Sequence, residues 1–163
     1  MRDPKDVLCS AYHHCVKAAA AFDYQGTFQE FVGHFLNGHV ESGDYWDFNR
    51  GYLENKDGFN ILYITYEDLS RDKITCIKKI SEFLGYKSIS IEQIESVDKP
   101  TRFESMVGTQ RPISGDNVKG KVGQNKEMLS ESQRLELIKQ TKSKFDGLGD
   151  DIVVPSCYFS ESI

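Results

Sequence analysis

The chain has 163 residues and a net charge of −5, with 39% hydrophobic and 28% charged residues. These values suit a soluble globular protein with one real core, and the acidic balance argues against general nucleic-acid binding. No stretch approaches the roughly 20 apolar residues that span a bilayer, and residues 1–6 hold no apolar signal core, so we expect a cytoplasmic protein without a membrane partner.

Three helices are predicted in the first third of the chain. Asp3 and Pro4 form a typical helix start, with Asp3 as N-cap and Pro4 at the first helical position, and this helix is expected to include the alanines at 18–21. A third, shorter helix is expected over residues 45–53. The second helix is predicted by an apolar stripe at spacings of three and four: Phe28, Phe31, Val32 and Phe35.

One β-strand is predicted, over residues 60–66, because this run is rich in β-formers and almost wholly apolar. Such a run suits the interior of a parallel sheet covered on both faces. A helix ending at Gly85 is expected next, followed by a short helix over residues 90–97. The apolar side of the longer helix comprises Ile74, Ile77, Ile80, Phe83 and Leu84.

The last third is predicted to begin with an irregular, glycine-rich stretch over residues 107–125 and to end with a helix over 130–145 that stops at Gly147. Helices around a strand indicate a three-layer α/β/α protein with a parallel sheet. Because a sheet needs several strands and only one is evident, the chain is interpreted as a piece of something larger. The cysteines lack metal-site spacing, so we expect reduced thiols and no metal: Cys9, Cys15, Cys76 and Cys157.

Two features suggest an anion site. From Lys99 to Lys126 the chain carries six basic residues against two acids, which fits either an anion site or an exposed loop with solvated lysines. Arg2 precedes a predicted helix start and Ser10 follows two turns later. Free helix N–H groups, a guanidinium and a hydroxyl can together hold a phosphate monoester, although an arginine at a domain edge is more often solvated.

The run from Arg2 to His14 resembles the cytosolic sulfotransferase signature, in which the order is Arg-Asn/Asp-Pro-Lys-Asp-x-x-x-Ser-x-Tyr. The resemblance extends over essentially all of residues 1–163. It implies a single sulfotransferase domain with the P-loop-hydrolase-like fold, of which this chain is the C-terminal part without the N-terminal strands. It also implies that Arg2 and Ser10 bind the 3′-phosphate of 3′-phosphoadenosine 5′-phosphosulfate (PAPS).

Two further motifs resemble nucleotide-binding segments of that family. The sequence Tyr66-Glu-Asp-Leu is similar to the family's strand-end motif, which implies a nucleotide contact for Tyr66. The sequence from Thr101 to Met106 is similar to Thr-Ser-Phe-x-x-Met, which implies that Thr101 and Phe103 flank the adenine. The residues alone leave other roles open, because Tyr66 can simply close a strand and Phe103 can pack in a core.

A third motif lines up with the family's Arg-Lys-Gly-x-x-Gly loop, the second clamp on the 3′-phosphate. Lys119 and Gly120 match, whereas Val118 stands at the arginine position. A charge-assisted hydrogen bond contributes roughly 1.5–3 kcal/mol. The loss of the arginine therefore predicts weaker binding of the 3′-phosphate unless Lys121 takes its place. The tryptophan that usually follows Gly123 is also replaced.

The resemblance implies in-line transfer of a sulfuryl group from PAPS to a hydroxyl or amine of a small molecule. The family's 5′-phosphosulfate loop and catalytic histidine precede the arginine motif, so we expect this chain to lack the reaction centre and assign no catalytic residue. His13 and His14 are not expected to replace the base. The family's dimer segment is degraded, since Ser130 replaces its threonine and its valine and glutamate are absent.

Two interpretations of the chain's function, of different classes, stay open. The chain is either an incomplete sulfotransferase or a non-catalytic module that binds 3′-phosphoadenosine nucleotides or a protein partner. A relative of the P-loop kinases is disfavoured, because no Gly-x-x-x-x-Gly-Lys-Ser/Thr run occurs.

Overall fold

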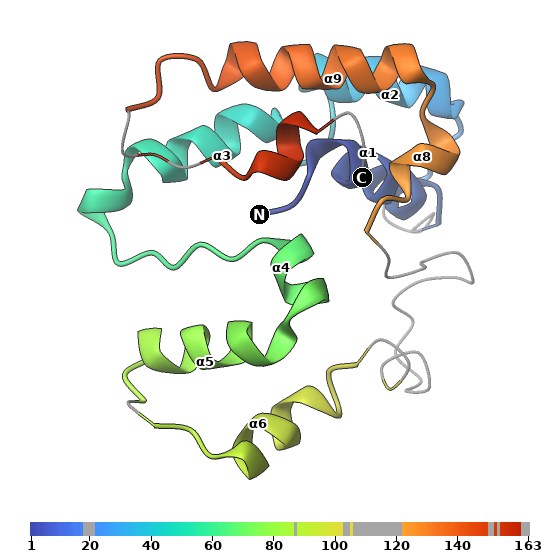
Figure 1. The fold of residues 1–163 in the computed structure, drawn as a ribbon. Helices are drawn as coiled ribbons and strands as arrows, with labels where there is room; N and C mark the ends of the chain where they lie inside the picture. The colour runs from blue at the N-terminus through green and yellow to red at the C-terminus, as the bar shows by residue number, and fades with distance from the viewer. Residues whose placement is uncertain are drawn as a thin grey trace. The chain divides into compact units, whose positions relative to one another are not determined.

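A computed structural model describes residues 1–17, 22–86, 88–102, 105, 122–149, 152 and 154–160 (Figure 1). Within these ranges the chain forms helices joined by irregular segments, and no β-strand occurs. The chain divides into two compact units, Met1–Ile61 with Gly123–Ile163 and Leu62–Val122. Each unit is described by itself.

The first unit is built on the helices predicted at both ends of the sequence. Its elements are α1 (Pro4–Lys17), α2 (Phe28–Leu36), α3 (Tyr45–Glu54), the 3₁₀ turn η1 (Lys56–Gly58), α8 (Asn125–Met128), α9 (Glu131–Lys144) and the 3₁₀ turn η2 (Ser156–Phe159). Helix α1 contacts α2, α8 and α9, and α9 also contacts α3 and η2. Segments from both ends of the sequence therefore share one packed unit.

The helices of this unit begin where their capping residues predict. Thr27 and Ser130 each form a capping box, in which the hydroxyl accepts the N–H of the third helical residue and that residue's side chain accepts the cap's N–H. The Asp44 carboxylate accepts the N–H groups of Trp46 and Asp47 at the start of α3. Side-chain caps of this kind stabilise a helix by about 0.5–2 kcal/mol each.

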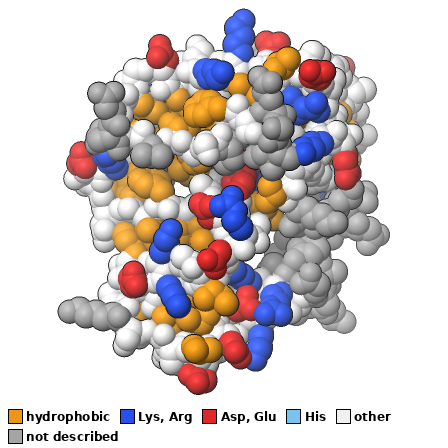
Figure 2. Space-filling view, in the orientation of Figure 1, with side chains coloured by type: hydrophobic (Ala, Val, Ile, Leu, Met, Phe, Trp, Pro, Cys, Tyr) orange, Lys and Arg blue, Asp and Glu red, His pale blue; other side chains and the backbone are white. Residues whose placement is uncertain are grey.

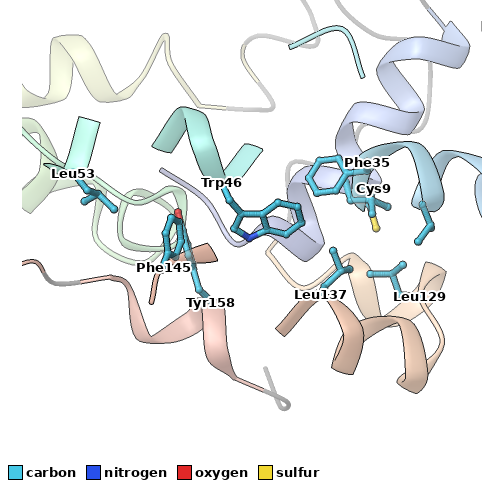
Figure 3. Packing of buried hydrophobic residues seen from close by; sticks show 10 residues of the cluster. Cys9, Phe35, Trp46, Leu53, Leu129, Leu137, Phe145 and Tyr158 are labelled. Carbon is cyan, nitrogen blue, oxygen red and sulfur yellow. The ribbon is translucent and has the colours of Figure 1, made fainter. Parts of the chain in front are cut away.

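The core of the first unit centres on Trp46 (Figure 3). Its indole ring is fully buried and its Nε1–H donates to the Thr141 hydroxyl at 2.9 Å, so the polar atom of the ring is satisfied. The ring of Phe35 packs edge-on against it at 5.6 Å. Leu137 and Tyr158, also fully buried, bring α9 and η2 into the same cluster.

The second unit contains α4 (Tyr66–Arg71), α5 (Lys73–Phe83) and α6 (Ile91–Asp98). Thr65 caps α4 and Asp72 caps α5, each with its side chain accepting a backbone N–H of the first turn. Ser90 caps α6 with a capping box. The expected helix stop at Gly85 is confirmed, since α5 ends at Phe83. Gly85 has a φ of +91°, which is readily adopted only by glycine.

The predicted strand over residues 60–66 is wrong for the described structure. Residues 60–65 carry no regular secondary structure, and Tyr66 already begins α4. Phe59, just before this run, and Thr65, at its end, do have extended backbones, with ψ near 150°. A strand also needs a hydrogen-bonded neighbouring strand, and none occurs within the described ranges. The parallel sheet and the three layers expected from sequence are therefore not confirmed among the residues that the structure describes.

The apolar side predicted for α5 exists, but little of it is covered. Ile77 and Cys76 are buried, whereas the other apolar residues of that side reach the surface: Ile74, Ile80, Phe83 and Leu84. Figure 2 shows exposed hydrophobic side chains in orange among the charged ones. Among the residues that the structure describes, no helix is long and apolar enough to cross a bilayer.

Candidate nucleotide site

The first turn of α1 is held by its own charged residues, which are buried. The N–H of Lys5 donates to Asp3 Oδ1 at 2.9 Å, so Asp3 caps the helix as predicted. The Lys5 ammonium lies 3.1 Å from Asp3 Oδ2 and donates to the carbonyl of Tyr158 at 3.4 Å. Burial raises the pKa of Asp3, and the charge of Lys5 opposes that effect. The start of α1 is thereby tied to the C-terminal turn.

Arg2 is fixed just before this turn. The Tyr45 hydroxyl donates to the Arg2 carbonyl and lies 3.0 Å from the Tyr158 hydroxyl. The Arg2 guanidinium lies 3.9 Å from Asp6 Oδ2, and its side chain is 19% exposed. A partly exposed guanidinium beside a helix N-terminus is a favourable place for an anion, because the free N–H groups and the helix dipole add to its charge.

Ser10 lies on α1, six residues after Pro4, and is exposed. At a rise of 1.5 Å per residue this position is about 9 Å further along the helix axis. Asp6 and Ser10 are four residues apart and therefore share one side of the helix, and Arg2 contacts Asp6. The spacing of eight residues between Arg2 and Ser10 thus places both along the same side of α1.

Asp6 lies beside Arg2 and was not predicted to have a role of its own. Its carboxylate is buried and accepts hydrogen bonds from Gly123 N at 2.7 Å, Asn125 N at 2.9 Å and Asn125 Nδ2 at 2.8 Å. Gly123 has a φ of +83°, in the left-handed region that favours glycine. These partners lie 117 and 119 residues away in the sequence, and no local pattern predicts such a contact.

The remaining predicted site residues belong to other parts of the chain. Tyr66 is half-buried at the start of α4, and Thr101 is exposed just beyond α6, where its hydroxyl donates to the Val97 carbonyl at 2.6 Å. Phe103, Lys119 and Gly120 lie outside the described residues, as does Val118. Arg2 therefore lies just before α1 and Ser10 lies on it, and all seven site assignments stay predictions.

Two cations of the basic stretch are paired with acids of α6. Arg102 forms two hydrogen bonds with Asp98, at 2.9 and 2.6 Å, and Lys99 donates to Glu95 at 2.8 Å. The hydrogen bond from Arg102 lowers the pKa of Asp98. Pairs at this spacing on an exposed helix are common surface interactions, so these two residues give the anion interpretation of the stretch no support.

The two histidines of α1 each contact an aromatic ring, and Cys9 of the same helix is buried. His14 packs against Phe22 with ring centroids 5.1 Å apart, and His13 lies 5.8 Å from Tyr12. Burial raises the pKa of the Cys9 thiol to about 12, so this thiol is a neutral packing group. Across the described residues, no group of three or more His, Cys, Asp or Glu side chains is placed to hold a metal ion.

Comparison with known proteins identifies the family. The model of the sulfotransferase domain matches residues 1–149. The chain belongs to the sulfotransferase family. Sulfotransferase 6B1 of Mus musculus is 33% identical over 158 residues, which cover 93% of this chain and 52% of that protein. Amine sulfotransferase of Oryctolagus cuniculus is 37% identical over 105 residues, covering 64% of this chain and 34% of that protein.

Solved structures have the same sulfotransferase fold. Mouse sulfotransferase SULT7A1, complexed with PAP, superposes with a TM-score of 0.80 at 24% identity, over 90% of this chain and 56% of that one. Retinol dehydratase, in a complex with retinol and PAP, superposes with a TM-score of 0.79 at 26% identity, over 94% of this chain and 48% of that one. The chain spans about half the length of these structures and of sulfotransferase 6B1, and about a third of the amine sulfotransferase.

Proposed function

We propose that this chain forms the 3′-phosphoadenosine-binding part of a PAPS-dependent sulfotransferase. The observation that supports the proposal is that Arg2 lies just before α1 with its guanidinium 3.9 Å from Asp6, while Ser10 lies on α1 four residues after Asp6. A phosphate monoester there would meet a guanidinium, a hydroxyl and the positive end of a helix. Both solved structures named above are complexes with PAP, the nucleotide that remains after sulfuryl transfer from PAPS.

In this proposal the other residues complete the nucleotide site. Lys119 and Gly120 supply the second clamp on the 3′-phosphate, with the glycine allowing the backbone to approach the oxyanion closely. Tyr66, Thr101 and Phe103 contact the adenosine, and the Phe103 ring offers a face on which adenine can stack. The support for these five assignments is the match of their motifs to the family together with the sulfotransferase domain match.

The reaction of the whole enzyme is transfer of the sulfuryl group of PAPS to a hydroxyl or amine of a small molecule. The acceptor oxygen or nitrogen bonds to sulfur, the bond from sulfur to the 5′-phosphate oxygen breaks, and a base takes the acceptor proton. We assign no residue of this chain to the base or to the sulfuryl group. Its part is to hold the nucleotide so that the sulfur lies in line with the acceptor.

The proposal also covers the location, the acceptor, the metal requirement and the oligomeric state of the protein. We propose a cytoplasmic protein with a small-molecule acceptor, no metal cofactor and no dimer of the family's usual kind, since the segment from Lys126 to Leu135 departs from the dimer motif. A non-catalytic module that holds the same nucleotide is a second candidate. Sulfuryl transfer from labelled PAPS to a phenol or amine, measured with a whole protein that contains this chain, distinguishes the two, because only the enzyme forms product.

The proposal is tested by titrating PAP and AMP, which lacks the 3′-phosphate, into the wild-type chain and the Arg2→Ala variant. Loss of a charge-assisted hydrogen bond is expected to weaken PAP binding by about 10- to 100-fold, while AMP binding stays the same. Arg134→Ala is the matched control, since Arg134 donates to the Leu129 carbonyl elsewhere in the same unit. Equal PAP affinity in the wild type and Arg2→Ala removes Arg2 from the site.

A further inference from the structure

Asp6 connects the start of α1 to the end of the glycine-rich stretch, at Gly123 and Asn125. Its carboxylate is 1% exposed and accepts three hydrogen bonds, from Gly123 N, Asn125 N and Asn125 Nδ2, at 2.7 to 2.9 Å. A buried carboxylate is costly unless its oxygens are hydrogen-bonded, so these donors must keep their places. The bonds therefore fix the position of Gly123 and Asn125 relative to α1.

The same carboxylate also lies next to Arg2, the residue proposed to bind the 3′-phosphate. Asp6 Oδ2 lies 3.9 Å from the Arg2 guanidinium and 2.7 Å from the Gly123 nitrogen. One oxygen atom thus faces Arg2 and the end of the loop at once. In the sequence, Gly123 follows Gly120 by only three residues, so a shift of Gly123 shifts the end of the loop assigned to the second clamp.

We propose that Asp6 is a positioning residue for the 3′-phosphate site, holding Arg2 and the end of the glycine-rich loop at the same helix start. The inference rests on the proposed function and extends it to a residue outside the nucleotide contacts. Asp6 makes no bond to the phosphate itself, because two anions repel each other. Its effect passes through the groups that it holds.

The test compares Asp6→Asn with Asp44→Asn. Asp44 is a close match, since its carboxylate also accepts two backbone N–H groups and pairs with a cation, Lys144, in the same unit. For each variant the measurements are the affinities for PAP and AMP, the melting temperature, and the hydrogen exchange of the Gly123 and Asn125 amides. The ratio of the two affinities isolates recognition of the 3′-phosphate from general loss of stability.

Asp6→Asn is expected to lower PAP affinity at least about 10-fold, to leave AMP affinity unchanged and to speed exchange at Gly123 and Asn125. Asp44→Asn is expected to keep the PAP to AMP ratio of the wild type. Faster exchange in Asp6→Asn with a wild-type ratio overturns the inference and leaves the proposed function intact. Equal PAP and AMP affinity in the wild-type chain overturns both.

Asn125→Ala serves if Asp6→Asn does not fold. This variant removes the Nδ2 bond and keeps the two backbone N–H donors to Asp6, so the unit retains most of the anchor. A several-fold loss of PAP affinity without a change in AMP affinity supports the role of Asp6. An unchanged ratio at Asn125→Ala contradicts it.

Discussion

At the scale of single residues, aspartates fix much of the first unit. Asp3 caps α1, Asp6 anchors the segment at Gly123, and Asp44 caps α3 while binding Lys144. The role of Asp3 was predictable, because a cap and its N–H partner lie two residues apart. The role of Asp6 was not, because its partners come from the far end of the sequence and only the fold brings them near.

The Asp44–Lys144 pair predicts how the stability of the first unit depends on pH. Burial favours a higher pKa for Asp44, but hydrogen bonds from Lys144 and from the N–H groups of Asp47 and Trp46 outweigh it and lower the pKa of this carboxyl from its ordinary value. A carboxyl with a lowered folded-state pKa contributes stability that is complete above its unfolded pKa and is lost as pH falls through the folded one.

Urea unfolding of the wild type and Asp44→Asn at pH 7 and at a series of values below pH 4 measures this contribution. We expect the two proteins to differ in the free energy of unfolding at pH 7 and to converge as the pH falls. A difference that stays constant down the series would show that the charge of Asp44 has no part in it.

At the scale of elements, the sequence predicted helices far better than the strand. Capping and apolar periodicity are local, so α2, α3, α5, α6 and α9 were all predicted near their observed bounds. The strand over residues 60–66 failed because strand formation depends on a neighbour that the run itself does not specify. The one-turn helix α8 and the six-residue α4 are too short to show a clear periodicity.

The capping box of α9 predicts a stability loss in Ser130→Ala. The Ser130 hydroxyl accepts the Gln133 N–H at 3.3 Å, and the Gln133 side chain accepts the Ser130 N–H at 2.8 Å. Loss of such a cap costs about 1 kcal/mol, which lowers the melting temperature by roughly 2–4 °C in a chain of this size. Ser143→Ala, at an exposed position inside the same helix, is the control and is expected to leave the melting temperature the same or slightly higher. An equal drop in both variants would rule out the cap as the cause.

At the scale of the whole molecule, the sequence predicted the family correctly but did not predict the arrangement of secondary structure. The motifs around Arg2, Tyr66, Thr101 and Lys119 led to the sulfotransferase family, and the domain match over residues 1–149 confirms it. The layered parallel sheet expected with that family does not appear within the described residues. Sheet topology is a property of many distant pairings, so a motif can identify a family while saying little about how much of its fold one segment forms.

The core around Trp46 predicts a large difference between two leucines of α9. Leu137 is fully buried, whereas Leu135, two residues earlier, is 43% exposed. Leu137→Ala is expected to reduce the free energy of unfolding by about 2–5 kcal/mol, because it removes buried surface and leaves a cavity. Leu135→Ala is expected to cost less than about 1 kcal/mol. Urea unfolding followed by Trp46 fluorescence measures both, and similar losses would contradict the assigned core.

In the proposed site the guanidinium of Arg2 and the hydroxyl of Ser10 bind one phosphate. A crystal structure of the chain with PAP would show whether they do. We expect the 3′-phosphate at the side of α1, within hydrogen-bond distance of both groups. A nucleotide whose 3′-phosphate touches neither Arg2 nor Ser10 would contradict it.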